Sequence, residues 1–349
     1  MLIIYFFITL LMLCSISFCR NCFHDGYLSK EQTNSIKGFF IVVVFCRHIA
    51  PYLADSGYDF SMLGDNIFRW IDGRIEQLLV VMFLFYSGYG VMESIKKKGK
   101  TYIDSIPHRR LLTTLLNFDV AVGIFLVVDI CFDIHYETKD IVLAFTGWKS
   151  IGNSNWYIFV ILCCYFSTYL TYKIFARINN NRSLIGGGAN LLIIICIYVV
   201  LVLKKQGYWY DTIFSYPLGI YFSLYKNELE NILKRNYAKC LLVIFALFLM
   251  LMYLPYNIKG IVANTRACAL AILIVLLSMK LQINSKALSW LGKHLFPLYI
   301  YQRIGMIILS EYDGGVFIHD NPYFYILSCA LITLIFGWTY KYIQIKINK

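Results

Sequence analysis

Two titratable residues interrupt an otherwise apolar stretch of the chain. In SIKGFFIVVVFCRHIAPYL, residues 35–53, Lys37 and His48 flank a run that a bilayer would accept as a helix. Their spacing of just over three helical turns projects both side chains from nearly the same face, about 16 Å apart along the axis. Near neutral pH an imidazole can exchange a proton or carry an acyl group. The pair is therefore a candidate reactive centre.

Both residues also have ordinary structural interpretations. A lysine near the end of a membrane helix can extend its ammonium to the interface, and a histidine can hydrogen-bond to a neighbouring helix. Titratable groups inside a bilayer cost on the order of 2.5–3.5 kcal/mol each, which makes them functional candidates by default. Arg47 lies about 100° round the helix from His48, so we expect it to anchor at the outer interface.

A carboxylate in a later apolar run is a third candidate. Asp119 lies near the middle of the run 111–132, where a carboxylate needs a cation or an imidazole beside it. The sequence leaves its partner open. The candidates are Lys37, Arg110, Arg303 and His48.

These residues belong to a chain whose composition is that of a polytopic membrane protein. Its 349 residues are 59% hydrophobic and only 15% charged, and many runs are long enough to cross a hydrocarbon core of about 30 Å. We expect an all-α transmembrane bundle with a ten-span core and one additional N-terminal hydrophobic helix. Residues 1–30 would form the anchor helix and linker, and residues 31–349 the membrane domain. The apolar runs lie at about 2–18, 36–53, 77–92, 111–132, 156–176, 184–203, 210–225, 239–256, 261–279, 295–310 and 323–340.

The net charge of +12 is distributed unevenly among the connectors. Every second connector is rich in Lys and Arg, which predicts cytoplasmic loops, a cytoplasmic C-terminus and an outer N-terminus, and gives no indication of nucleic-acid binding. The first run lacks a preceding basic segment, so we expect a retained anchor, with a cleaved signal as the alternative. The basic set is Arg20, Lys30, Lys96, Lys97, Lys98, Lys100, Arg109, Arg110, Lys173, Arg177, Arg182, Lys226, Lys234, Arg235, Lys239, Lys280, Lys286, Lys293, Lys341, Lys346 and Lys349.

One of these basic connectors is a candidate phosphate site. It contains KKKGK at 96–100 and HRR at 108–110, which either set the topology or receive the phosphates of a nucleotide-bearing donor. The preceding FLFYSGYG, residues 83–90, has a Ser-Gly pair that permits close helix packing. The basic residues singled out here are Lys96, Lys97, Lys98, Arg109 and Arg110.

The eleven cysteines predict neither a disulfide framework nor a metal centre. Most lie inside apolar runs, where a thiol behaves as a small hydrophobe. Cys19 and Cys22 have CxxC spacing, but without a second pair or a histidine cluster we regard the spacing as incidental.

Taken in order, four segments resemble the acyltransferase family 3 of integral membrane O-acyltransferases. They are KGFFIVVVFCRH, FLFYSGYG with its basic loop, NSNWYI at 153–158 and SWLGKHLFPLYIYQ at 289–302. The resemblance covers roughly residues 30–345. It implies that an acyl group, usually acetyl, moves from cytoplasmic acyl-CoA to a hydroxyl of a cell-surface glycan or lipid-linked sugar.

By matching position, the resemblance assigns His48 as the essential histidine and Lys37 as its basic partner, in a place where the family usually has arginine. Arg109 and Arg110 match the basic cluster that enters the third core helix. Ser87 and Tyr89 match the family's aromatic-Ser-Gly segment, so the resemblance adds them to the residues expected to bind the donor. No permanently bound cofactor is implied, because acetyl-CoA is a substrate. Trp70, Trp148 and Trp156 in the outer segments offer apolar faces for sugar rings.

Two other functions use the same polar residues. In a transporter of glycan or lipid units, Lys37, His48 and Asp119 would line a pathway, but the repeats typical of transporters are not visible in the sequence. A polysaccharide polymerase would be expected to have a larger external loop than any in this chain.

Overall fold

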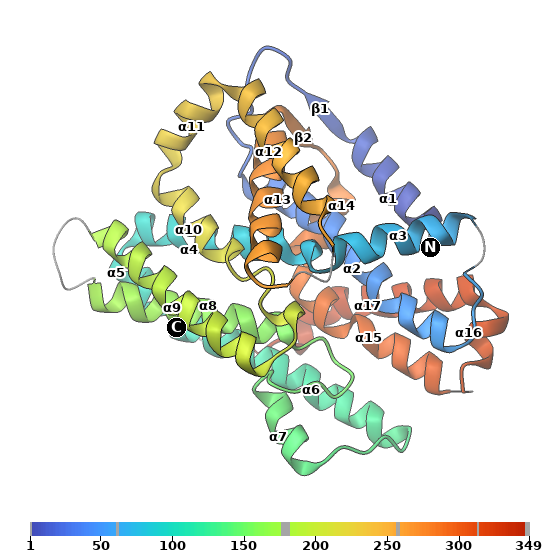
Figure 1. The fold of residues 1–349 in the computed structure, drawn as a ribbon. Helices are drawn as coiled ribbons and strands as arrows, with labels where there is room; N and C mark the ends of the chain where they lie inside the picture. The colour runs from blue at the N-terminus through green and yellow to red at the C-terminus, as the bar shows by residue number, and fades with distance from the viewer. Residues whose placement is uncertain (1, 61–62, 176–181, 256–258, 313, 346–349) are drawn as a thin grey trace.

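The computed structural model describes residues 2–60, 63–175, 182–255, 259–312 and 314–345. It is almost entirely helical (Figure 1), which confirms the all-α bundle. The elements are α1 Leu2–Cys14, β1 Ile16–Phe18, α2 Lys30–Asp55, α3 Leu63–Ile75, η1 Glu76–Val80, α4 Val81–Lys98, α5 Lys100–Ile106, η2 Pro107–Leu112, α6 Thr113–Cys131, α7 Thr138–Phe145, α8 Trp156–Phe175, α9 Arg182–Lys204, η3 Gly207–Trp209, α10 Ser215–Leu224, α11 Lys226–Arg235, α12 Tyr237–Tyr253, α13 Ile261–Lys280, β2 Leu281–Ile283, α14 Lys286–Lys293, α15 Leu295–Glu311, α16 Val316–Asp320 and α17 Pro322–Ile343.

The number of spans differs from the expected ten plus one. Within the described residues, seven helices are long and apolar enough to cross a membrane, or eight if the pair α11 and α12, bent by 98°, forms one span. Two expected spans are short helices, because α1 has 13 residues and α10 has 10. Hydropathy counts apolar residues and does not detect where the chain bends or ends a helix.

Helix α2, which carries Lys37 and His48, is positioned by close contact with α14. A Cβ on Gly38 would lie 1.8 Å from the carbonyl oxygen of Leu288, and a Cβ on Gly292 would lie 1.9 Å from that of Asn34. The two glycines therefore let the backbones touch, as small residues do between membrane helices. The N-terminus of α2 is capped by Ser29, whose side chain accepts a hydrogen bond from the amide of Gln32 at 3.2 Å.

The same device joins α4 to α10. A Cβ on Gly88 would lie 2.1 Å from the carbonyl oxygen of Tyr216, and a Cβ on Gly219 would lie 2.1 Å from that of Phe85. The Ser-Gly pair of FLFYSGYG is thus at a helix contact, as the packing interpretation predicts. Two further packed pairs, α12 with α13 and α15 with α17, lie side by side in Figure 1.

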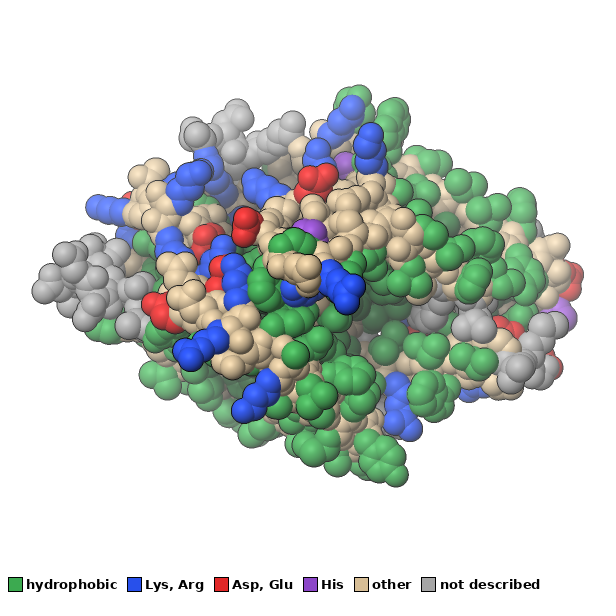
Figure 2. Space-filling model, turned by 90° about the horizontal axis from the view of Figure 1, so that it is seen from above, with side chains coloured by type: hydrophobic (Ala, Val, Ile, Leu, Met, Phe, Trp, Pro, Cys, Tyr) green, Lys and Arg blue, Asp and Glu red, His purple; other side chains and the backbone are tan. Residues whose placement is uncertain are grey.

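The basic connectors gather at one end of the bundle, which we call the basic end. Lys173 pairs with Asp104, Lys96 donates to the carbonyl oxygen of Ser223 at 2.8 Å, and Lys280 donates to that of Arg20 at 3.2 Å. Figure 2 shows many Lys and Arg side chains gathered on one face and bordered by apolar surface. Of the basic set, Arg177, Lys346 and Lys349 lie outside the described residues.

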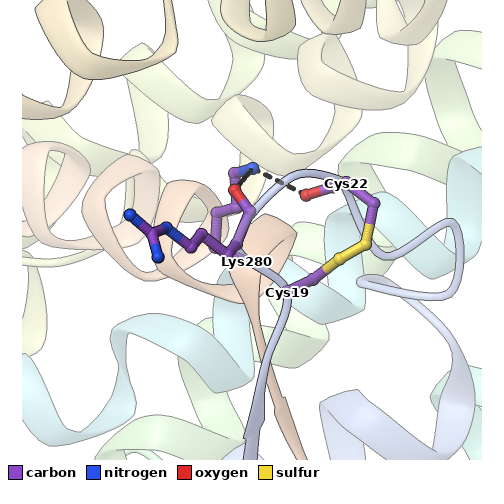
Figure 3. Close-up of a disulfide and its surroundings, with 4 residues drawn as sticks. Cys19, Cys22 and Lys280 are labelled. Carbon is purple, nitrogen blue, oxygen red and sulfur yellow. Dashed lines mark hydrogen bonds between the residues drawn. A yellow bond between two sulfur atoms is a disulfide. The ribbon is translucent and has the colours of Figure 1, made fainter.

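A short sheet at the basic end was not predicted. Strands β1 and β2 pair antiparallel, with Ile16 opposite Ile283, and tie the segment after α1 to the segment after α13. Beside them Cys19 and Cys22 form a disulfide, so the expectation that their spacing is incidental was wrong (Figure 3). Lys280 donates a hydrogen bond to the carbonyl oxygen of Cys22 at 2.6 Å. The two cysteines can bond because the chain turns between them, and the hydrogen bond from Lys280 to the carbonyl oxygen of Cys22 stabilises this turn.

Candidate active site

A cavity of about 810 Å³ opens at the end of the molecule opposite the basic end. Several parts of the chain line it. Its residues include His48 and Arg47 from α2, Arg69 and Asp72 from α3, Asn153 and Ser154 from the turn before α8, and Arg303 from α15. The cavity therefore has walls of mixed polarity, with convergent polar groups of the kind that orient a polar ligand.

His48 is one of the residues that line this cavity. The ring lies 6.1 Å from the ring of Tyr299, which in turn lies 5.3 Å from that of Tyr157. The buried Nδ1 has no hydrogen-bond partner among the described residues. Because that nitrogen is not used to hold helices together, His48 can exchange a hydrogen bond or a proton with a ligand.

Arg47 pairs with Asp72 and so joins α2 to α3. The expectation that Arg47 is only an interface anchor was therefore incomplete. Its guanidinium is 37% exposed and the carboxylate of Asp72 is 10% exposed, so the pair is partly shielded and stronger than one at an open surface. The pair fixes one side of the cavity immediately beside His48.

The turn 150–155 forms a second side of the cavity. The Nδ2 of Asn155 donates to the carbonyl oxygen of Gly147 at 2.8 Å. The Oδ1 of Asn153 accepts from the amide of Ile151 at 3.1 Å. Arg303 reaches from α15 to donate to the carbonyl oxygen of Gly152 at 3.1 Å. These bonds hold the turn of the NSNWYI motif against α15.

Several buried polar atoms of the cavity have no protein partner within the described parts of the chain. They are the Nδ1 of His48, the Nδ2 of Asn153, the Oγ of Ser154 and the Nε of Arg303. A buried polar atom left without a hydrogen bond costs about 1–3 kcal/mol. Four such atoms on residues that line one cavity favour a ligand with several hydroxyl or carbonyl oxygens.

Tyr58 and Trp156 also line the cavity. Tyr58 donates to the Oδ2 of Asp65 at 3.1 Å, and burial together with this bond raises the pKa of Tyr58 to about 12. Of the three tryptophans expected to stack on sugars, Trp156 lines the cavity. Trp148 instead lies under Lys205, whose Nζ is 3.7 Å from the ring centroid, and Trp70 is exposed on α3.

Lys37 lies far from this cavity, toward the basic end of α2. Its ammonium is within electrostatic range of Arg110. The Nε of Arg110 donates to the hydroxyl of Tyr102 at 3.2 Å, and its guanidinium lies 5.7 Å from the ring centroid of Tyr165. Among the described residues, Arg110 is the one charged group that acts on Lys37, and the strongest influences on Arg110 come from burial and from tyrosines. Two partly buried cations without a carboxylate between them favour an anionic ligand.

The rest of the predicted phosphate site is more exposed. Arg109 and Arg110 lie in η2, a π-helical turn of the kind that often occurs at functional sites. The turn directs Arg110 inward and leaves Arg109 exposed. Lys96 donates to the Oε1 of Glu93 at 2.8 Å. Lys97 and Lys98 are exposed on the last turn of α4.

Ser87 and Tyr89 occupy packing positions on α4. The side chain of Ser87 contacts the hydroxyl of Tyr157. Tyr89 is buried, with its ring 6.4 Å from that of Phe222.

Asp119 does not form any of the pairs considered for it. Its buried Oδ1 has no partner in the described residues, and Asp119 is not among the residues that line the cavity. Two of the candidate cations bond elsewhere. Arg303 binds the carbonyl oxygen of Gly152, and Arg110 binds the hydroxyl of Tyr102.

Comparison with known proteins bears on the whole chain. A family model described as an acyltransferase domain matches residues 32–341. No curated protein and no solved structure matches the chain. The matched range includes every residue of the cavity and of the Lys37–Arg110 cluster.

Proposed function

Because the chain belongs to this acyltransferase family, we propose that it moves an acetyl group from acyl-CoA at the basic end to a hydroxyl of a glycan or lipid-linked sugar in the cavity. The observation that carries the proposal is the set of unpartnered polar atoms around His48. Donors of this kind match the hydroxyl and ring oxygens of a sugar.

The donor fits the opposite end of α2. No carboxylate is among the strongest influences that the described residues exert on Lys37 and Arg110. The pair has the charge to hold a diphosphate, with Arg109 and Lys96–Lys98 attracting the donor from solution. The pantetheine arm would then run along α2 toward His48, about 16 Å away at 1.5 Å per residue.

His48 would act as the general base. The imidazole takes the proton of the acceptor hydroxyl as the acceptor oxygen bonds to the thioester carbonyl carbon. The carbon–sulfur bond then breaks, and the departing thiolate takes the proton from the imidazolium. A transient acyl-imidazole is the alternative route, in which the imidazole nitrogen first displaces the thiolate. Arg303 and Arg47 lie close enough to His48 for their charges to act on it and could stabilise the oxyanion.

A membrane assay tests the activity. Membranes that contain the protein should transfer radiolabel from acetyl-CoA to glycan material, in an ester that alkaline hydroxylamine releases. Membranes without the protein should not. Equal, hydroxylamine-resistant labelling in both preparations would contradict acyl transfer to oxygen.

The donor site is tested by two neighbouring arginines. Arg110→Ala should weaken coenzyme A binding by about 10- to 100-fold, which corresponds to one charge-assisted contact of about 1.5–3 kcal/mol. Arg109→Ala is the matched control and should change the affinity less, since its side chain is exposed. Titration calorimetry in detergent measures both. Unchanged binding in both variants would leave η2 with a purely topological role, and equal losses would contradict the distinction between the inward Arg110 and the exposed Arg109.

We also propose that the protein lies in the cytoplasmic membrane, with the basic end and the C-terminus in the cytoplasm. The connectors support this orientation through their charge. The disulfide at the same end favours an oxidising compartment. The charge bias extends over many connectors, whereas the disulfide is one local pair, so we give the charge bias more weight.

Thiol labelling of intact cells distinguishes the two orientations. In a background without other cysteines, His135→Cys lies in an exposed segment between α6 and α7 and should react with a membrane-impermeant maleimide. The native Cys22, kept alone and also exposed, should react only after the cells are opened. Labelling of Cys22 in intact cells would reverse the proposed orientation.

A further inference from the structure

A second cavity, of about 850 Å³, lies beneath α1 on the other side of α3. We call it the apolar crevice. Its lining is almost entirely hydrocarbon, with Phe6, Leu10 and Leu13 from α1 and Phe40 and Val43 from α2. Protein interiors leave few voids larger than a water molecule, so in a bilayer a space of this size holds hydrocarbon.

Helix α3 is the wall between the apolar crevice and the cavity that contains His48. Ile71 and Ile75, four residues apart, line the apolar crevice. Arg69 and Asp72, three residues apart, line the polar cavity. Residues three and four apart share a helix face, so two different faces of one 13-residue helix, about 110° apart round its axis, meet an apolar and a polar space.

The division continues into the residues on either side of α3. In η1, Gln77 lines the polar cavity whereas Leu78 and Leu79 line the apolar crevice. On α2, His48 faces the polar cavity and Val43, five residues earlier, faces the apolar crevice. The polar cavity and the apolar crevice are thus both lined by the same three consecutive elements, α2, α3 and η1.

From this shared boundary we infer that the apolar crevice binds the hydrocarbon chain of the acceptor, which is a lipid-linked sugar with its head beside His48. The inference rests on the proposed function for the identity of the head. A free polysaccharide has no apolar part to fill the apolar crevice. An amphiphile can place its hydrocarbon chain in the apolar crevice and its polar head in the polar cavity. Bulk membrane lipid could enter the apolar crevice, but its headgroup would not be selected by the unpartnered donors of the polar cavity.

Photo-crosslinking tests the site without any acyl donor. The purified protein in phosphatidylcholine nanodiscs is exposed to octadecyl glucoside that carries a diazirine near the end of its chain. Peptides from residues 2–14 and 71–79 should be labelled. A phosphatidylcholine probe with the same diazirine chain should label them at least tenfold less. Equal labelling by both probes would show ordinary lipid in the apolar crevice and overturn the inference.

Two substitutions on α1 provide a matched pair. Thr9 lines the apolar crevice, and Thr9→Trp should block labelling by the glucoside probe. Phe7 is 63% exposed and does not line it, so Phe7→Trp should leave labelling unchanged. Selective labelling that survives Thr9→Trp would place the chain elsewhere. Selective labelling without any transfer from acetyl-CoA would instead contradict the proposed function alone.

Discussion

Replacing His48 with glutamine or alanine is expected to reduce acyl transfer by about 10²- to 10⁴-fold, the range that general acid–base catalysis contributes. Glutamine retains polar contacts but cannot accept a proton at neutral pH, so both variants should be inactive if His48 exchanges protons. The O-acetyl content of cell glycans should then fall to the level of cells that lack the protein.

The structure indicates that this loss would not come from unfolding. The Nδ1 of His48 bonds to no described group, so removing the imidazole takes no hydrogen bond at that nitrogen from another described residue. His24→Ala is the matched control, because the Nε2 of His24 is also buried without a partner but lies near β2, where the His24 amide donates to the carbonyl oxygen of Met279. Full acetylation in His48→Gln, with normal membrane insertion, would exclude His48 as the base.

The second large effect is expected from a methyl group added at Gly88. A Cβ there would lie 2.1 Å from the carbonyl oxygen of Tyr216, and a backbone atom cannot move aside as a side chain can. Overpacking typically costs about 1–3 kcal/mol, and we expect Gly88→Ala to reach the upper end of this range. Thermal unfolding in detergent, followed by helical circular dichroism, measures the loss.

Gly90 provides a control on the same helix. A Cβ at Gly90 meets nothing within 4 Å, so Gly90→Ala should raise stability by up to about 1 kcal/mol through the lower conformational entropy of alanine. The two substitutions add the same methyl group two residues apart and should have opposite signs. Destabilisation by Gly90→Ala, or tolerance of Gly88→Ala, would contradict the described contact between α4 and α10.

Local sequence patterns predicted the helix at the centre of the site. The run 36–53 lies within α2, Lys30–Asp55, and the spacing of Lys37 and His48 already placed them on one helix. The close approach of α4 to a neighbour also followed from its Ser-Gly pair. Such features depend on residues within a few turns of one another, where helical periodicity determines the geometry.

Contacts between distant segments could not be predicted in this way. The pairing of Arg47 with Asp72 requires α3, which lies in a segment that hydropathy assigns to an outer loop. A signal for α3 was present, because Phe68, Ile71 and Ile75 recur at the spacing of an amphipathic helix. Nothing local indicates that Arg303, one of the four partners considered for Asp119, approaches the turn at Gly152 instead.

The length of α2 between its two polar groups has a consequence for the choice of donor. If the diphosphate is held at Lys37 and Arg110 while the reaction takes place at His48, the acyl carbon must travel along three turns of helix that offer it only apolar side chains. A thioester on a long flexible arm can reach that far, whereas a compact donor such as acetyl phosphate cannot touch both ends. Helix α2 would thus act as a molecular ruler, which excludes short activated acyl compounds by reach rather than by fit.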